Sequence, residues 1–366
     1  MMNMNKWTMA LAAAGVVSLS SVAQAQEAVA AAAVDAASVE LSGYVASSYT
    51  MSSGRGATAN TFRGTEGNSD KFSLDVVSLS LSSAKGEGEW ASGYNVTMWI
   101  GDAASDIGTS DNNVAPGAQS DNTLELMEAN IDLTVPVGSG LNLTVGQIGT
   151  VVGYETYDYT ANAFYNRSWA FAAEPTHHTG IMAEYQLSEQ VGVGAGIVND
   201  STNAVTNNTT DDSAVGYLLS ATYGNGFMAE EGFDVSVGAV LDMGVDGEEQ
   251  DVYYYQVGLP IEGIVPNLTA DFAATLVDHD RTENNDTELY QLYVGYELND
   301  TTSLNVRYEF GDDDITAGKS DIKSYAVGIS HDLWANVSSR IEYMTSDYEG
   351  AANDDEALTI SLVYSF

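Results

Sequence analysis

The chain has 366 residues, no cysteine, and 52 acidic against 11 basic residues, which gives a formal net charge of −41. This charge argues strongly against a nucleic-acid partner, because phosphate backbones require basic surfaces. The absence of cysteine excludes disulfides, thiolate metal sites and cysteine nucleophiles. The 21 Tyr, 9 Phe and 5 Trp argue against intrinsic disorder, since disordered chains are poor in aromatic residues.

The first 25 residues have the pattern of a cleaved signal peptide. Lys6 supplies a positive charge, residues 7–17 are apolar, and Ala23-Gln24-Ala25 is a small-x-small cleavage pattern. The apolar stretch is shorter than the ~20 residues that a spanning helix needs, so a short membrane anchor is the weaker alternative. We expect a signal peptide over 1–25, a flexible Ala-rich lead over 26–37 and the folded part over 38–366.

From residue 38 onward, apolar and polar residues alternate in segments of about ten residues, the pattern of membrane-barrel strands. In the last segment, Leu358, Ile360 and Leu362 share one face while Thr359 and Ser361 share the other. No run after the signal peptide reaches helical spanning length, so membrane residence requires a closed barrel. Sixteen strands are predicted, over 38–50, 70–84, 90–101, 123–134, 140–147, 178–187, 190–199, 213–224, 231–243, 251–259, 266–277, 287–298, 301–310, 320–331, 336–347 and 356–366.

The connections between these segments alternate between short and long. Short ones include 136–139, 188–189 and 299–300, whereas 102–122 and 148–177 are long and mostly rich in small polar and acidic residues. A membrane barrel has short turns at one end, long loops at the other and an even number of strands. The fold class expected is therefore all-β, a transmembrane antiparallel β-barrel of about sixteen strands; a soluble β-sandwich has no reason to keep this alternation.

Strand parity separates the two faces of the wall. Charged residues that alternate with apolar neighbours should face the lumen, because a charge on the lipid face costs a few kcal/mol near the midplane. Arg307 and Arg340 could form a basic ladder in the pore or ion pairs that brace the wall. The pore-lining residues predicted in this way are Arg307, Glu309, Arg340, Glu342, Asp132 and Glu184.

Tyrosines gather toward the ends of the predicted strands. Such residues suit an interfacial girdle, with the ring among lipid headgroups and the hydroxyl in water. The ordinary β-propensity of Tyr is an equally good explanation for any single one. The residues concerned are Tyr44, Tyr94, Tyr185, Tyr217, Tyr296, Tyr308 and Tyr364.

The longest connection, 148–177, is the third long loop and exceeds the usual length of a structureless loop, which indicates a function. We expect it to fold into the lumen, where Glu155, Asp158 and Glu174 would face Arg167 across a constriction and select solutes by charge. The alternative is a loop packed on the barrel rim, with Arg167 in a local ion pair.

Several short motifs resemble the OmpL-like family of β-barrel porins. Most lie between residues 140 and 200, and the likeness runs over roughly 39–366. The chain end, with Tyr364 and Phe366, also looks like the C-terminal aromatic signal that the barrel-assembly machinery reads. The motifs are Leu41-Ser42-Gly43-Tyr44, Gly101-Asp102-Ala103, Gly153-Tyr154-Glu155, Asn166-Arg167-Ser168, Glu174-Pro175, His178-Thr179-Gly180 and Ile197-Val198-Asn199.

The resemblance implies an outer-membrane pore, surrounded by lipid, for small hydrophilic solutes or ions. The excess of acid predicts mild cation selectivity, although it also suits a saline habitat. By analogy with sixteen-stranded porins, a homo-trimer is one state open to the chain. The alternative is an acidic surface protein or adhesin without a channel.

An enzyme is not expected, because no Gly-x-Ser-x-Gly, His-Glu-x-x-His or phosphate-binding Gly loop occurs. No cofactor or metal is expected either. Adjacent His177 and His178 rarely converge on one ion, and the Asp-rich loop tips lack the spacing of a calcium loop.

Overall fold

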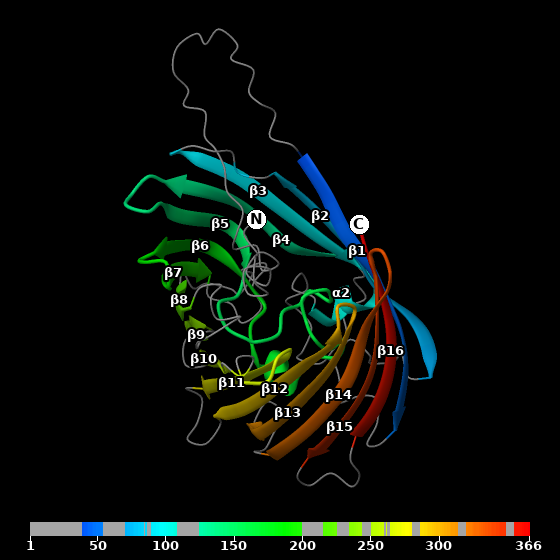
Figure 1. Cartoon of the computed structure of the whole chain (residues 1–366). Helices are drawn as coiled ribbons and strands as arrows, with labels where there is room; N and C mark the ends of the chain where they lie inside the picture. The colour runs from blue at the N-terminus through cyan, green and yellow to red at the C-terminus, as the bar shows by residue number, and fades with distance from the viewer. Residues whose placement is uncertain are drawn as a thin grey trace.

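A computed structural model shows a closed barrel of sixteen antiparallel strands (Figure 1). It describes residues 39–366 apart from 54–69, 84, 86–88, 108–123, 200–214, 225–233, 244–249, 260, 262–263, 280–285, 314–319 and 349–354. The expected signal peptide and lead lie outside the described residues. The strands are β1 (Val39–Ser53), β2 (Lys71–Ser83), β3 (Ala91–Ile100), β4 (Leu124–Val135), β5 (Leu141–Gly149), β6 (His177–Gln186), β7 (Val191–Asn199), β8 (Val215–Tyr223), β9 (Asp234–Met243), β10 (Gln250–Leu259), β11 (Leu268–His279), β12 (Thr287–Asn299), β13 (Thr302–Asp313), β14 (Ser320–Trp334), β15 (Val337–Tyr348) and β16 (Asp355–Ser365).

Each strand pairs with its neighbours in the sequence, and β1 closes the ring on β16. At the seam, Gly43 N donates to Phe366 O (3.0 Å) and Phe366 N donates to Gly43 O (2.9 Å). Closure pairs the backbone groups of both edge strands, which a hydrocarbon environment demands. The prediction of sixteen strands is confirmed.

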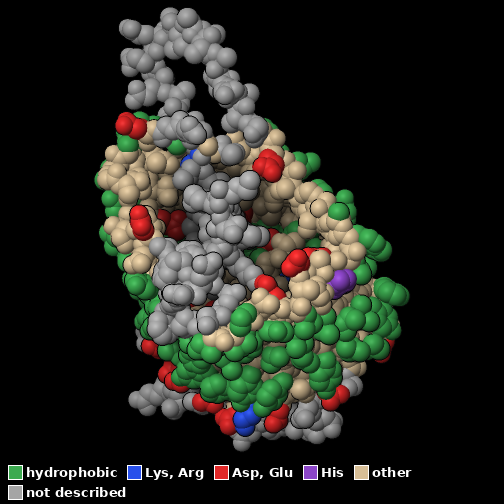
Figure 2. All heavy atoms as spheres, in the orientation of Figure 1, with side chains coloured by type: hydrophobic (Ala, Val, Ile, Leu, Met, Phe, Trp, Pro, Cys, Tyr) green, Lys and Arg blue, Asp and Glu red, His purple; other side chains and the backbone are tan. Residues whose placement is uncertain are grey.

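The outer face of the wall is apolar, as strand parity predicts. On β13, Val306 and Phe310 are 40% and 38% exposed, whereas Arg307 between them is 1% exposed and faces inward. Figure 2 shows the hydrophobic side chains as a band around the visible wall, with acidic side chains beyond the band at the rim. A single sheet can sustain such alternation only if lipid wets one face.

Aromatic side chains on the outer face form contacts across strands β11 to β14. Tyr290 stacks on Phe310 with ring centroids 5.4 Å apart, and Tyr308 stacks on Tyr325 at 4.7 Å. Tyr44 is an exception to the predicted girdle: it faces the interior and is 4% exposed. The hydroxyl of Tyr44 accepts a hydrogen bond from Tyr159 N (3.3 Å) inside the barrel, so its position reflects interior packing.

Two short helices lie among the described residues, and neither is long and apolar enough to cross a bilayer. Helix α2 (Asp102–Ile107) follows β3, and its Ala103 and Ala104 are buried in a cluster with Trp99. Helix α3 (Trp169–Ala173) belongs to the connection 150–176 between β5 and β6. That connection, green in Figure 1, runs through the interior of the ring of strands.

Candidate functional site

The connection 150–176, called the inner loop below, holds its shape through short-range hydrogen bonds. Asp158 Oδ1 accepts from Thr160 N (2.7 Å), and Asn162 Oδ1 accepts from Thr156 N (2.9 Å). Ser168 begins α3 by accepting a hydrogen bond from Phe171 N (3.1 Å), the usual role of an N-cap serine.

Arg307 on β13 forms the central attachment of the inner loop to the wall. Its Nη1 lies 2.5 Å from Glu155 Oε1, with both side chains almost fully buried. The same guanidinium donates to the carbonyl oxygens of Asn166 (3.1 Å) and Arg167 (3.3 Å). Glu155 also accepts from Ser168 N (2.7 Å). A buried charge pair with additional hydrogen bonds fixes the geometry on both sides.

The other two arginines that the structure describes, Arg340 and Arg167, bind backbone carbonyls. Arg340 on β15 donates to Tyr159 O (2.8 Å) and Asn162 O (3.0 Å). Arg167 in the loop donates to Tyr157 O (2.7 Å), and its guanidinium lies 4.6 Å from the centre of the Tyr159 ring. Arg167, Arg307 and Arg340 therefore all hold the inner loop in place through its carbonyl oxygens.

Carboxylates of the wall accept hydrogen bonds from backbone N–H groups of the inner loop. Glu309 accepts from Trp169 N (2.9 Å) and Ala170 N (2.8 Å), the first N–H groups of α3. Glu342 accepts from Tyr165 N (2.7 Å) and from the Asn166 side chain (2.7 Å). Carboxylates thus satisfy donors that would otherwise be buried without partners.

Three loop tyrosines donate to acidic residues of the wall. Tyr157 donates to Glu128 (2.7 Å), Tyr154 donates to Asp271 (3.0 Å), and Tyr165 donates to Asp75. Burial raises the pKa of each of these tyrosines well above its ordinary value. Their hydroxyls therefore stay protonated and remain donors over the physiological range.

An apolar belt on the inner wall was not predicted from the sequence. Leu218, Val240, Val252 and Val277 face inward on β8 to β11, are at most 2% exposed, and are cross-strand neighbours in that order. They belong to one cluster with loop residues Val152, Ala170 and Ala173. The available sequence signal is an apolar residue on both faces, as in Leu218-Leu219. The inner loop is thus held by apolar packing as well as by polar contacts.

Because Gly238 on β9 has no side chain, the backbone of the inner loop can lie directly against the wall there. A Cβ atom built there would overlap the carbonyl oxygen of Val151. We expect Gly238→Val to displace the start of the inner loop while leaving the barrel closed, because a backbone obstacle cannot rotate away. Increased protease cleavage within 150–176 of folded protein in detergent would show this. Gly328→Ala, whose added Cβ would lie at an ordinary contact distance of 3.5 Å from Ile341 O and from the Phe164 ring, is the control; equal cleavage of both variants would contradict the prediction.

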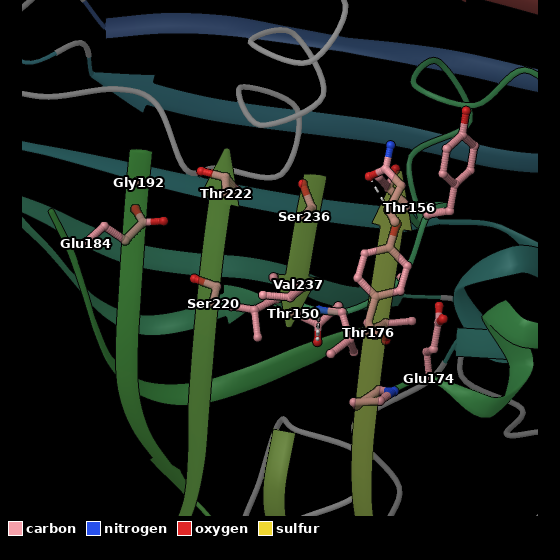
Figure 3. Close-up of a pocket in the computed structure, with 18 of the residues that line it drawn as sticks. Thr150, Thr156, Glu174, Thr176, Glu184, Gly192, Ser220, Thr222, Ser236 and Val237 are labelled. Atoms are coloured by element: carbon pink, nitrogen blue, oxygen red, sulfur yellow. Dashed lines mark hydrogen bonds between the residues drawn. The ribbon is translucent and has the colours of Figure 1, made fainter. Parts of the chain in front are cut away.

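A cavity of about 340 Å³ lies between the inner loop and the wall from β5 to β10 (Figure 3). Ser220, Thr222 and Ser236 contribute hydroxyls from the wall, and Glu184 contributes a carboxylate on the same side. The loop supplies threonines and Glu174. Among the residues that line the cavity in the described part of the chain, none is Lys or Arg.

The four residues predicted for a constriction do not face one another across water. Glu155 contacts Arg307 of the wall directly, and Arg167 is 4% exposed among loop carbonyls. Asp158 is half-buried and caps its own turn, and Glu174 lines the cavity. The physical reason is that an almost fully buried guanidinium needs several acceptors, which backbone carbonyls and Glu155 provide.

The six residues predicted for the pore lining all lie on the inner face but differ in access. Arg307, Glu309, Arg340 and Glu342 are covered by the inner loop. Asp132 is 4% exposed and accepts from Thr144 (2.9 Å), whereas Glu184 lines the cavity. Nearby, Lys85 from the β2–β3 connection donates to Thr134 (3.1 Å) and Asn142 (3.3 Å). Burial lowers the pKa of Lys85 to about 8.

The pKa of Glu174 is raised to about 8, chiefly by burial and with a contribution from the charges of Glu155 and Glu309, while a hydrogen bond from Thr275 opposes the rise. The folded chain therefore keeps a proton that the unfolded chain releases near the ordinary value of 4.5. The contribution of this carboxyl group to the free energy of unfolding is therefore fully present below about pH 4.5 and is lost as the pH rises to about 8.

Between these two pH values, the free energy of unfolding should fall with rising pH by up to about 1.4 kcal/mol per pH unit because of Glu174. We expect Glu174→Gln to remove this part of the slope. Thermal midpoints in detergent from pH 5 to 9 measure the difference. Parallel curves for the variant and the parent would contradict it.

A family-level comparison covers nearly the whole chain. Residues 38–366 match the family described as "Putative beta-barrel porin-2, OmpL-like". A search of curated proteins finds no match.

Several solved outer-membrane protein structures are similar to this chain in fold. The anion-selective porin from Comamonas acidovorans has a TM-score of 0.61 at 14% identity, over 90% of this chain and 99% of that chain. The Salmonella typhi OmpF complex with daunomycin has a TM-score of 0.60 at 14% identity, over 90% and 97%. The trimer form of Vibrio cholerae OmpT has a TM-score of 0.56 at 12% identity, over 90% and 99%. At such identities the likeness concerns the fold alone.

Proposed function

Since the chain belongs to the OmpL-like β-barrel porin family and is an outer-membrane porin, we propose that it passes small hydrophilic solutes by passive diffusion with a mild preference for cations. The inner loop narrows the lumen and leaves a route along the wall from β5 to β10. The observation that carries this proposal is the composition of the cavity: carboxyl and hydroxyl groups line it without Lys or Arg among the described residues.

The interior arginines do not offset this acidic lining. Arg167, Arg307 and Arg340 are at most 7% exposed and are held by loop carbonyls and Glu155. Glu155 is paired with Arg307, and both Glu155 and Glu174 are buried, whereas Glu184 is half-buried. Glu184 is therefore the carboxylate of the described lining with the most access to a passing ion. A pore selects through the charges that line it, and the net charge of −41 adds a long-range attraction that salt screens within ~8 Å at physiological ionic strength.

The anion-selective porin from Comamonas acidovorans has the same fold. Selectivity, however, depends on side chains at the narrow point and not on the barrel. The absence of basic residues from the described cavity lining therefore favours cations here.

Single-channel recording in a planar bilayer tests the proposal. In a KCl gradient, the reversal potential of the purified chain should have the sign of a K⁺-preferring pore and should decline as the salt concentration rises. A reversal potential of the anion-selective sign would overturn the cation preference. The absence of conductance from folded protein would favour a surface or structural role.

Assembly in the membrane forms the last part of the proposal. Tyr364 and Phe366 are 47% and 46% exposed on the outside of the barrel beside the seam, and we assign them the role of the aromatic signal read by the assembly machinery. Deletion of Phe366 should lower the yield of folded protein in the outer membrane. The trimer form of Vibrio cholerae OmpT makes a homo-trimer the first oligomer to test, by cross-linking in detergent.

A further inference from the structure

A lysine from the connection between β2 and β3 lies inside the barrel. Lys85 Nζ donates to Thr134 Oγ1 on β4 (3.1 Å) and to Asn142 Oδ1 on β5 (3.3 Å), so its side chain extends past β3. The inward residues of β3 at this level are Ala91, which is the cross-strand neighbour of Thr134, and Gly93. Neither has a side chain long enough to obstruct Lys85. The two hydrogen bonds therefore give the Lys85 ammonium group a defined place on the inner wall.

Two carboxylates lie near this ammonium group. Asn142, which accepts a hydrogen bond from Lys85, is the cross-strand neighbour of Glu184 on β6. Asp132 lies on β4 two residues before Thr134, on the same face of the strand. The charges of Asp132 and Glu184 both act on Lys85. Lys85, Asp132 and Glu184, called the charge cluster below, keep one negative charge uncompensated when all three are ionised.

The charge cluster borders the cavity of the proposed channel. Asn142 and Glu184 both line that cavity, and Figure 3 shows the Glu184 side chain beside Gly192 at one side of it. Lys85 is half-buried and is joined to the lining by its hydrogen bond to Asn142. An ion that passes Glu184 therefore also experiences the charge of Lys85, because partly buried charges are screened less than charges in open water.

We propose that Lys85 is a specificity-determining residue, a tethered counter-ion that weakens the cation preference set by Asp132 and Glu184. The inference rests on the proposed channel function and names a residue that tunes the selectivity of the same passage. The fixed ammonium group competes with a passing cation for the two carboxylates. Conduction requires that an ion bind weakly enough to leave, and the ammonium group keeps the binding of cations weak at this point.

A purely structural role explains the contacts of Lys85 less well. A cation that braces the wall would contact a carboxylate directly, as Arg307 contacts Glu155. The hydrogen bonds of Lys85 go to the neutral oxygens of Thr134 and Asn142 instead. Asp132 accepts from Thr144 through Oδ1, and its buried Oδ2 has no hydrogen-bond partner in the part of the chain that the structure describes. Lys85 therefore balances the charge of Asp132 through space.

Reversal potentials of Lys85 variants in a KCl gradient test the inference. Lys85→Met should raise the ratio of K⁺ to Cl⁻ permeability about threefold at low salt, because it removes one positive charge beside the passage. Lys85→Arg keeps the charge and should leave the ratio unchanged. Adding Asp132→Asn to Lys85→Met restores the net charge of the cluster and should bring the ratio back to that of the parent. Lys323→Met, at an exposed position on β14, is the control and should have much less effect.

The pH dependence gives a readout that a structural role would not produce. Burial lowers the pKa of Lys85 to about 8, although the charges of Asp132 and Glu184 oppose the shift. The ammonium group is therefore charged at about pH 6.5 and neutral at about pH 9.5. The difference in permeability ratio between the parent and Lys85→Met should be about threefold at the lower pH and should disappear at the higher one. Asp132 and Glu184 are present in both proteins, so their own titration does not create this convergence.

The outcomes separate this inference from the proposed function. An unchanged permeability ratio in Lys85→Met, or a difference from the parent that is equal at both pH values, would overturn the role of Lys85 and leave the channel intact. A parent that prefers anions but shifts toward cations in Lys85→Met would support the role of Lys85 and overturn the cation preference. Absence of KCl conductance from folded protein would overturn both.

Discussion

Replacing Arg307 by methionine is expected to destabilise the barrel by about 3–5 kcal/mol, the usual cost of leaving one partner of a buried ion pair without the other. Arg307 is 1% exposed and binds Glu155 and two carbonyl oxygens of the inner loop. Removing the guanidinium leaves the Glu155 carboxylate and both carbonyls in a dry site. Urea unfolding in detergent micelles, followed by tryptophan fluorescence, measures the loss.

A double-mutant cycle identifies the cause of that loss. Arg307→Met leaves the Glu155 carboxylate without a partner, and Glu155→Gln removes that charge. The double variant should therefore be more stable, by about 2 kcal/mol, than the sum of the two single effects predicts. Lys323→Met removes an exposed charge on β14 and should change stability by less than about 0.5 kcal/mol. Additive effects of the two interior substitutions would show that Arg307 and Glu155 do not act as a pair.

Reversing the charge of Glu184 is expected to change the ratio of K⁺ to Cl⁻ permeability about tenfold in favour of chloride at low salt. A unit charge about 4 Å from an ion in water is worth about 1 kcal/mol. Glu184→Lys changes the charge by two units and acts oppositely on K⁺ and Cl⁻, so about 4 kcal/mol is the upper bound; passage at greater distances from the side chain should leave about 1.4 kcal/mol, which is tenfold. Glu184 lines the cavity, and the charges that act on it, those of Asp132 and Lys85, are opposite in sign, so the substitution should dominate the change. Reversal potentials in KCl gradients give the ratio.

Glu189→Lys provides the matched control, since it makes the same change of net charge at an exposed position outside the cavity. Its permeability ratio should shift much less than that of Glu184→Lys, and the shift should vanish first as salt is raised. Equal shifts in the two variants would mean that total charge, and not the lining of this cavity, sets selectivity.

The sequence predicts the barrel well because lipid imposes a simple rule. A strand with lipid on one side must alternate, and this alternation located all sixteen strands with ends within three residues of those observed. The same parity placed Arg307, Arg340 and Glu184 on the inner face, where the structure has them. These are local patterns, which a sequence displays directly.

The contacts that attach the inner loop to the wall could not be predicted in the same way. Glu155 and Arg307 are 152 positions apart, and no periodicity relates a loop residue to a wall residue. The predicted constriction had acidic residues facing Arg167 across water, and this prediction neglected the cost of burying an arginine. A buried guanidinium needs several acceptors, so Arg167 and Arg307 bind backbone carbonyls, and Arg307 also binds Glu155. The apolar belt from Leu218 to Val277 was missed because inward positions of a pore are expected to be polar, whereas here they pack against the loop.

Accessibility of single cysteines tests most directly whether the open route follows the wall from β5 to β10. The chain has no cysteine, so Ser220→Cys in the cavity and Ser324→Cys, whose serine is 1% exposed on β14, can be compared without background. A cationic methanethiosulfonate reagent should react with the first, faster than an anionic one, and reduce the single-channel current, while the second stays unmodified. Equal reaction at both positions, or faster reaction with the anionic reagent, would contradict the route and its preference for cations.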